Sequence, residues 1–366
     1  MKRSLYTTLF LSLVLFFPFH QEAKAQDFVS AKYGSDFLSI GGGARALGMG
    51  GAHVGLVSDV TAGYWNPAGL AHLNNVELAY MHSERFAGIV SYDYGALALP
   101  ISGSESVVGV SFFRQGVDGI KNTLNAWDRE RNQPKANPTQ YFTEFSAADL
   151  AFMVSYANRL SDKTTWGTTA KVINSRLGPF AEAWGYSLDL GLQVQGDRYL
   201  FGINLMDITT MMKFWSVSAE NLRPLLEEFQ DEIPSGANER VRPTIKTGFG
   251  RYFDAGPVQI IAAIDADFRF EGRKAYYFNV GNMSIEPHAG IEVGYNDVVF
   301  LRAGVTDFHT DPDGNYYVSP TLGAGLQIGS IMLDYGFGSF AGMAADLGFT
   351  HRISLKVGLS QDFFAN

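Results

Sequence analysis

The stretch from Phe349 to Leu359 alternates between apolar and polar side chains, and this pattern constrains the fold more than any other feature. Because successive side chains of a β-strand point to opposite faces, a strand here has one apolar and one charged face. Only His351 interrupts the apolar set. Similar alternation recurs along most of the chain. A soluble sandwich can contain a few such strands, but a long series favours a barrel with lipid outside and a polar interior.

The first 25 residues predict an export signal. Lys2 and Arg3 precede an apolar run, and Ala23-Lys24-Ala25 offers a cleavage site of the small-x-small type. A retained membrane anchor is the alternative, but the run is short and is followed by this cleavage site. We therefore expect residues 1–25 to be a signal peptide and the protein to reside in the outer membrane of a Gram-negative bacterium.

Composition agrees with a membrane barrel and excludes several other classes of protein. No stretch after the signal holds about 18 consecutive apolar residues, so a membrane-spanning form must use strands. The 40 glycines and the 14% aromatic content suit closely packed strands and aromatic girdles. Cysteine is absent, which excludes disulfides and cysteine-ligated metals. The net charge of −9 gives no sign of nucleic-acid binding.

Fourteen alternating segments can be recognised in residues 76–366. They lie near 76–84, 86–100, 104–118, 142–158, 163–176, 182–196, 198–208, 243–253, 257–271, 286–296, 298–306, 317–329, 331–340 and 348–361. The first three are the least regular, and residues 275–283 are a candidate extra strand. Connections alternate between short and long, as in barrels with short periplasmic turns and long outer loops. The predicted fold is all-β: a fourteen-stranded antiparallel transmembrane β-barrel.

Several charged side chains fall on the phase of the strands that would face the lumen. These are Asp189, Asp265, Asp267, Arg269, Arg302, Asp334, Arg352 and Lys356. Charges would be costly against lipid, so we expect them to point inward. A charge-selective pore would concentrate one sign along its path, whereas this set mixes both. Ion pairing among themselves or with a plug is therefore favoured, and an aqueous or ligand-bearing channel remains the alternative.

Residues 26–75 precede the strands and have a different character. They contain a glycine-rich run with Gly48, Gly50 and Gly51, and then Asn66-Pro67-Ala68. A nucleotide-binding loop does not fit, because no Lys-Ser or Lys-Thr follows the glycines and no βαβ pattern surrounds them. Glycines here instead permit tight turns and close backbone packing inside a lumen. Pro67 lacks an N–H and has a fixed φ, while Asn66 can bond nearby backbone, so this motif predicts a turn.

The N-terminal motifs resemble those of a known family. Phe37-Leu38-x-Ile40, the run from Gly43 to Gly51, Ser58-Asp59-Val60-Thr61-Ala62 and the run from Trp65 to Leu70 are similar to the PorV/PorQ family, within the FadL-like group of outer-membrane barrels. The close match covers roughly residues 37–71. The resemblance implies that residues 26–75 fold into the barrel as a hatch, with Asn66-Pro67-Ala68 at its turn. It also implies accessory roles in type IX protein secretion, or passive transport of hydrophobic molecules.

Residues 209–242 are the strongest sequence candidate for a partner-binding outer loop. Its apolar anchor set is Met212, Phe214, Trp215, Leu225 and Phe229. Leu222, Leu225 and Phe229 are spaced as on one face of a short helix that Ser218 or Asn221 could cap. Such groups can equally pack over the barrel mouth as a lid, and a lid can also admit a hydrophobic ligand.

No catalytic arrangement of nucleophile, base and acid can be recognised, so we expect a protein that is not an enzyme and has neither metal nor cofactor. The expected partners are outer-membrane lipid and a secretion-system translocon subunit or secreted cargo domain. A hydrophobic ligand or detergent in the lumen is the alternative. The sequence favours a PorV-like secretion component over a FadL-like transporter.

Overall fold

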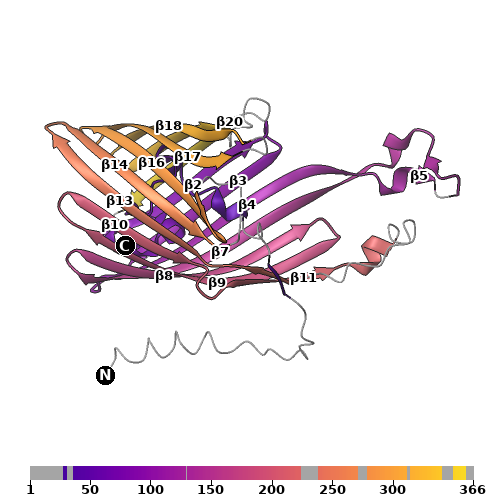
Figure 1. Cartoon of the computed structure of the whole chain (residues 1–366), viewed down its shortest axis with the longest axis horizontal. Helices are drawn as coiled ribbons and strands as arrows, with labels where there is room; N and C mark the ends of the chain where they lie inside the picture. The colour runs from indigo at the N-terminus through magenta and orange to yellow at the C-terminus, as the bar shows by residue number, and fades with distance from the viewer. Residues whose placement is uncertain are drawn as a thin grey trace, which may run out of the picture.

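The computed structural model describes residues 28–30, 36–128, 130–223, 238–270, 278–310, 314–339 and 349–359. Fourteen antiparallel strands form a closed barrel, which confirms the predicted fold class (Figure 1). Around the ring these are β2 (Val76–Arg85), β3 (Val90–Pro100), β4 (Ser106–Asn122), β7 (Thr143–Ser161), β8 (Thr164–Leu177), β9 (Ala181–Gln195), β10 (Tyr199–Met206), β13 (Thr244–Ala255), β14 (Val258–Arg269), β16 (Met283–Tyr295), β17 (Val299–Thr310), β18 (Tyr316–Ile328), β19 (Ile331–Ser339) and β20 (Phe349–Leu359). Pairing of β20 with β2 closes the ring.

The two faces of the strands differ as the alternation predicts. Leu355, Ile264 and Leu190 are 45%, 61% and 40% exposed on the outer face, while Arg352 and Asp265 are buried on the inner face. The exception in the last strand, His351, also lies outside, where its ring nitrogen is 2.7 Å from the Tyr335 hydroxyl. The outer face is therefore apolar where a membrane barrel must contact lipid. Among the described residues, no helix is long and apolar enough to cross a membrane.

Shorter strands extend the ring at one end. They are β1 (Phe28–Ser30), β11 (Met211–Val217), β12 (Asn238–Val241) and β15 (Phe278–Val280). Within the described residues, β15 pairs with the start of β16, so the described part of the candidate extra strand is a short hairpin extension and not a further barrel strand. β1 pairs in parallel with β12.

The interpretation of residues 209–242 as a loop is wrong for its described ends. β9 pairs with β10 up to Leu205 and then with β11 from Met212, so β11 continues the wall after a bulge at 207–210. Asp207 and Thr210 have positive φ there, which breaks the alternation that would have revealed the strand. A helix does begin at residues 219–223, and the Ser218 hydroxyl accepts a hydrogen bond from the Asn221 N–H at 3.4 Å.

The hairpin of β4 and β7 projects beyond the rest of the barrel (Figure 1). Its tip carries β5 (Trp127–Asp128), β6 (Gln133–Pro134) and the 3-10 turns η3 (Leu124–Ala126) and η4 (Pro138–Tyr141). This tip corresponds to the long polar connection between the third and fourth predicted segments.

After β1, residues 36–73 of the N-terminal segment fold into short turns of helix. These are η1 (Asp36–Ser39), α2 (Ala44–Gly48), α3 (Ala62–Trp65) and η2 (Pro67–His72). Most of their side chains are buried, and their partners are inward side chains of strands on all sides of the ring. The main core of the molecule therefore lies between this segment and the barrel wall.

Candidate functional site

The backbone of residues 36–73 is held inside the ring by wall side chains. The Asp265 carboxylate accepts from the N–H groups of His53 and Val54 at 2.8 and 2.7 Å. On other strands, the Asn204 amide donates to the Trp65 carbonyl at 2.9 Å, and the Gln193 amide donates to the Val54 and Val57 carbonyls. Buried backbone groups need such partners, and here the polar lumen supplies what a helix or sheet would supply elsewhere.

The predicted glycine motif lies directly against the strands. A Cβ at Gly48 would come 2.9 Å from the Cα of Gly323 on β18, and one at Gly50 would come 2.6 Å from the backbone of Val305 on β17. Gly50 and Gly51 also have φ of 65° and 85°, which side chains rarely adopt. Glycine is therefore required for both conformation and close approach.

Asn66, Pro67 and Ala68 form the start of η2, as the motif predicts for a turn. The Asn66 side chain accepts from the Ala68 N–H at 3.3 Å and donates to the carbonyls of Val54 and, on β9, Leu192. Gly191 on β9 makes room for it, because a Cβ there would lie 2.1 Å from the Asn66 side-chain oxygen. The motif thus joins the N-terminal segment to the wall.

One set of luminal charges surrounds Glu292 on β16. Arg45 of α2 donates to both carboxylate oxygens, at 2.9 and 2.8 Å, and Arg302 of β17 donates to Oε2, which also accepts from Arg45 Nε. Arg302 also reaches Asp334 of β19 at 2.6 Å. The Arg302–Glu292 contact joins the neighbouring strands β17 and β16, and the Arg302–Asp334 contact reaches across β18 to β19, so the network fixes the wall and the N-terminal segment together.

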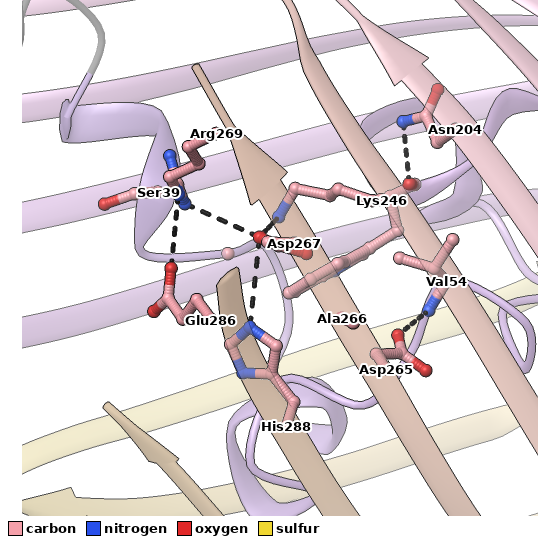
Figure 2. A network of polar contacts seen from close by, with 12 residues as sticks. Ser39, Val54, Asn204, Lys246, Asp265, Ala266, Asp267, Arg269, Glu286 and His288 are labelled. Atoms are coloured by element: carbon pink, nitrogen blue, oxygen red, sulfur yellow. Dashed lines mark hydrogen bonds and ion pairs between the residues drawn. The ribbon is translucent and has the colours of Figure 1, made fainter. Parts of the chain in front are cut away.

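A second network centres on Asp267 of β14 (Figure 2). Its carboxylate lies 2.6 Å from the Lys246 ammonium, 3.5 Å from the Arg269 guanidinium and 3.8 Å from His288. Arg269 also pairs with Glu286 at 3.2 Å. The ligand atoms of Asp267, Glu286 and His288 lie within 4.8 Å of one another, as in a metal site. Because two cations already contact the carboxylates, this group is an ion-pair network.

The remaining predicted luminal charges also contact partners. Asp189 and Asp207 lie 2.7 and 2.6 Å from the Lys171 ammonium. Arg352 donates to the carbonyls of Gly43 and Ile40, both at 3.1 Å. Lys356 pairs with Asp59 at 2.8 Å. The structure thus places all eight predicted charges in the interior, and each contacts the wall or the N-terminal segment.

The opposite side of the lumen has a different chemistry, which sequence reasoning missed. We call it the aromatic half and define it by five buried apolar and aromatic side chains on the inner face of β3, β4 and β7. They are Tyr92, Tyr94, Phe113, Ala151 and Met153, all at most 4% exposed. The charged half comprises the inward charges of β13, β14, β16, β17, β19 and β20. The available signal was the poor alternation of the first predicted segments, since strands apolar on both faces do not alternate.

Side chains of the N-terminal segment cover the aromatic half. The Phe37 ring lies 6.3 Å from Phe113, and the Tyr64 ring lies 5.7 Å from Phe113 and 6.0 Å from Tyr94. Trp65 spans both halves, because Lys246 of the charged half lies 5.5 Å from its ring. The contacts on this side are mainly apolar and aromatic.

The predicted partner-binding residues are only partly brought together. Met212 and Phe214 are 40% and 42% exposed on the outer face of β11, while Trp215 is half-buried on the same strand. Leu225 and Phe229 lie outside the described residues. The anchor set is therefore in part a strand face and not a loop.

A polar pocket of about 260 Å³ opens at the end of the barrel that carries the short β3–β4 turn, which is the periplasmic end if short turns face the periplasm. It lies between the end of η2 and the turn joining β3 to β4, and Ala71, Ser104 and Arg159 are among its lining residues. Its position is at the base of the aromatic half.

No family model and no curated protein matches the chain. Among solved structures, the CymD monoaromatic hydrocarbon channel is 12% identical with a TM-score of 0.53, and the match covers 88% of this chain and 98% of CymD. The toluene transporter TodX of Pseudomonas putida is 13% identical with a TM-score of 0.50, covering 87% and 97%. A Pseudomonas aeruginosa FadL homologue is 12% identical with a TM-score of 0.48, covering 87% and 98%.

At these identities the likeness establishes the fold alone. The chain shares the architecture of FadL-like outer-membrane barrels. Together with the apolar outer face of the closed ring, this confirms the predicted outer-membrane location.

Proposed function

We propose that the protein is a passive channel for hydrophobic small molecules, and that residues 26–75 act as its hatch. The observation that carries this proposal is the aromatic half of the lumen. A structural barrel plugged only by ion pairs would not need an apolar surface along one inner wall. A FadL-like fold shared with proteins described as a toluene transporter and a monoaromatic hydrocarbon channel supports the same function.

The contacts made by Phe37 suggest how a solute would enter. Its ring packs against Phe113 in an apolar cluster that also contains Tyr92 and Met153. A monoaromatic solute has the size and chemistry of this side chain, so it can make equivalent contacts when η1 moves aside. Apolar contacts are non-directional, which makes such an exchange far less costly than breaking a buried ion pair.

The periplasmic pocket gives the path an outlet. Polar groups at Ser104 and Arg159 would bind a hydrophobic solute weakly, which favours release after passage over the aromatic half. The luminal charges, by contrast, are occupied with one another and with the hatch. In this function they are structural and non-catalytic, and no cofactor is required.

Uptake of toluene by cells with an intact lipopolysaccharide layer tests the proposal. Cells that produce the protein should take up toluene faster than cells without it. Met153→Lys places a charge in the aromatic half and should abolish the gain, whereas Thr321→Lys, at a buried inward position beside the charged half, should retain it. Gel migration of unheated samples shows whether each variant folds. Equal uptake with and without the protein would reject a channel for such solutes.

A secretion component is the second candidate. It is favoured by the PorV/PorQ-like motifs of residues 37–71 and by the exposure of Met212 and Phe214. Large apolar side chains dominate partner binding, so Phe214→Ser combined with Met212→Ser should release any translocon subunit or cargo domain that copurifies. Retention of every copurifying protein by this double variant would remove the surface from consideration.

A further inference from the structure

The outer wall of the barrel carries a charged patch where lipid-facing side chains are expected. His82 and Glu84 of β2, Asp93 of β3 and Arg114 of β4 all lie on the outward phase of their strands. Their side chains are 44%, 60%, 21% and 36% exposed. We call these four residues the wall patch. Nothing in the proposed channel function uses them.

The wall patch interrupts the apolar band of the barrel. On β14 the outward side chains remain apolar from Val258 to Phe268, whereas on β4 the apolar run from Val108 ends at Phe112. The shorter run spans about 13 Å along the strand. A lipid-facing band is about 25 Å tall, so lipid would contact charged groups on this side.

Strand register shows that the patch is not simply above the membrane. Arg114 pairs with Leu150 of β7, and His82 pairs with Ile353 of β20. Leu150 and Ile353 are 39% and 55% exposed on the same outer face. Apolar side chains therefore flank Arg114 and His82 in the ladder, whereas Glu84 pairs with the outward His351 of β20. Charged groups beside lipid-facing side chains are costly unless a partner covers them.

Within one chain, the charged groups at the two edges of the patch make longer contacts than those at its centre. In the centre, His82 Nδ1 and the Tyr80 hydroxyl lie 2.8 and 2.7 Å from Asp93. At the edges, Arg114 lies 3.5 Å from Asp93, and His82 Nε2 lies 3.5 Å from Glu84. These edge distances exceed those of good hydrogen bonds. A cation at one edge and an anion at the other thus keep bonding capacity for an external group.

This order of charges is self-complementary. β3 lies between β4, which carries Arg114, and β2, which carries Glu84. A two-fold axis along the membrane normal, passing through β3, would bring Arg114 next to Glu84 of the partner subunit, and the reverse pair would form by symmetry. A lipid phosphate would require a cluster of cations, but the patch has one arginine beside two carboxylates.

We propose that the wall patch is the interface through which two copies of this chain associate side by side in the outer membrane. Each interface would contain two intermolecular arginine–glutamate pairs, screened from lipid by the flanking apolar side chains. The absence of cysteine makes a direct test possible, because a single introduced thiol has no competitor in the chain.

The test is disulfide formation in native outer membranes. Ser91 faces outward on β3 next to the axis, so Ser91→Cys should give a reducible band of twice the mass after mild oxidation. Ala266→Cys, outward on β14 across the ring, is the control and should remain monomeric. If Ser91→Cys is no more dimeric than this control, or is joined to a different protein, the proposal is wrong.

Charge reversal in the Ser91→Cys background tests the pairing itself. Arg114→Glu and Glu84→Arg should each reduce dimer at least several-fold, because like charges would then meet across the axis. Co-production of the two variants should restore the mixed dimer, in which both pairs are again of opposite sign. No restoration, with both variants folded by unheated gel migration, would contradict the two-fold arrangement.

Discussion

The charged and aromatic halves of the lumen hold the same N-terminal segment by different forces. Around Glu292 and Asp267 the bonds are directional, buried and partly shared between strands. Around Phe113 the contacts are apolar and require no fixed geometry. A buried ion is destabilised as soon as its partner leaves, whereas an apolar surface accepts any apolar replacement. The comparison suggests that the charged half anchors the hatch and that the aromatic half can release it.

The largest effect should follow from breaking the charged half. Arg302→Met leaves Glu292 and Asp334 without their shared cation and should lower the free energy of unfolding by about 3–5 kcal/mol. Urea unfolding in detergent, followed by circular dichroism, measures this. Arg251→Met is the matched control, because this guanidinium lies over the Tyr199 and Phe253 rings on the outer face. Loss of the Arg251 guanidinium should lower the free energy of unfolding by less than about 1 kcal/mol. Equal losses in the two variants would contradict an anchoring role of Arg302.

Lowering the pH should have an intermediate effect on stability, through His53, which lies where the two halves meet. The backbone N–H of His53 donates a hydrogen bond to the Asp265 carboxylate, and the imidazole ring of His53 lies 5.6 Å from the Trp65 ring. Burial lowers the pKa of His53 from 6.5 to about 3. Between these values the unfolded chain binds more protons than the folded one, so stability falls as the pH falls below 6.5.

At pH 5 this linkage should cost about 2 kcal/mol relative to neutral pH. Urea unfolding of the wild type and of His53→Gln across pH 5 to 7 measures it, because the variant lacks the titrating ring and should show a shallower slope. If both proteins lose stability in parallel, His53 is not neutral in the folded state.

The smallest effect on stability should come from the aromatic half. Phe113→Leu keeps the surface apolar and should cost below about 1.5 kcal/mol, yet it should raise toluene uptake by loosening the contact with Phe37. The same substitution at Phe300, which lies beside Arg302 of the charged half, is the control and should leave uptake unchanged. A rise in both variants would mean that the halves do not differ in transport.

The sequence predicted the parts of the fold that depend on periodicity. Strand number and facing were predictable because the charges of β14, β16 and β20 alternate with apolar side chains over long runs. The aromatic half was not, because Tyr92, Tyr94 and Phe113 face inward while Asp93 and Arg114 face outward, which blurs the alternation.

Other features depend on contacts that no local pattern encodes. The bulge at Asp207 interrupts the alternation of apolar and polar side chains, so β11 was predicted as part of a loop. Gly191 and Gly323 lie on ordinary strands, and only the approach of Asn66 and Gly48 explains why a side chain is absent there. Long-range packing of the N-terminal segment therefore determined what the sequence could not reveal.

Reversible tethering of the hatch to each half separates anchoring by the charged half from release at the aromatic half. A Cβ at Gly63 would lie 3.7 Å from that of Ser155 on β7, a spacing suited to a disulfide. Ala44 of α2 and Ser354 of β20 offer a tether to the charged side, because the Ala44 N–H donates to the Ser354 hydroxyl at 2.8 Å. Oxidised Gly63→Cys/Ser155→Cys should block toluene uptake until reductant is added, while oxidised Ala44→Cys/Ser354→Cys should transport normally. Equal uptake by the two oxidised proteins would contradict the account.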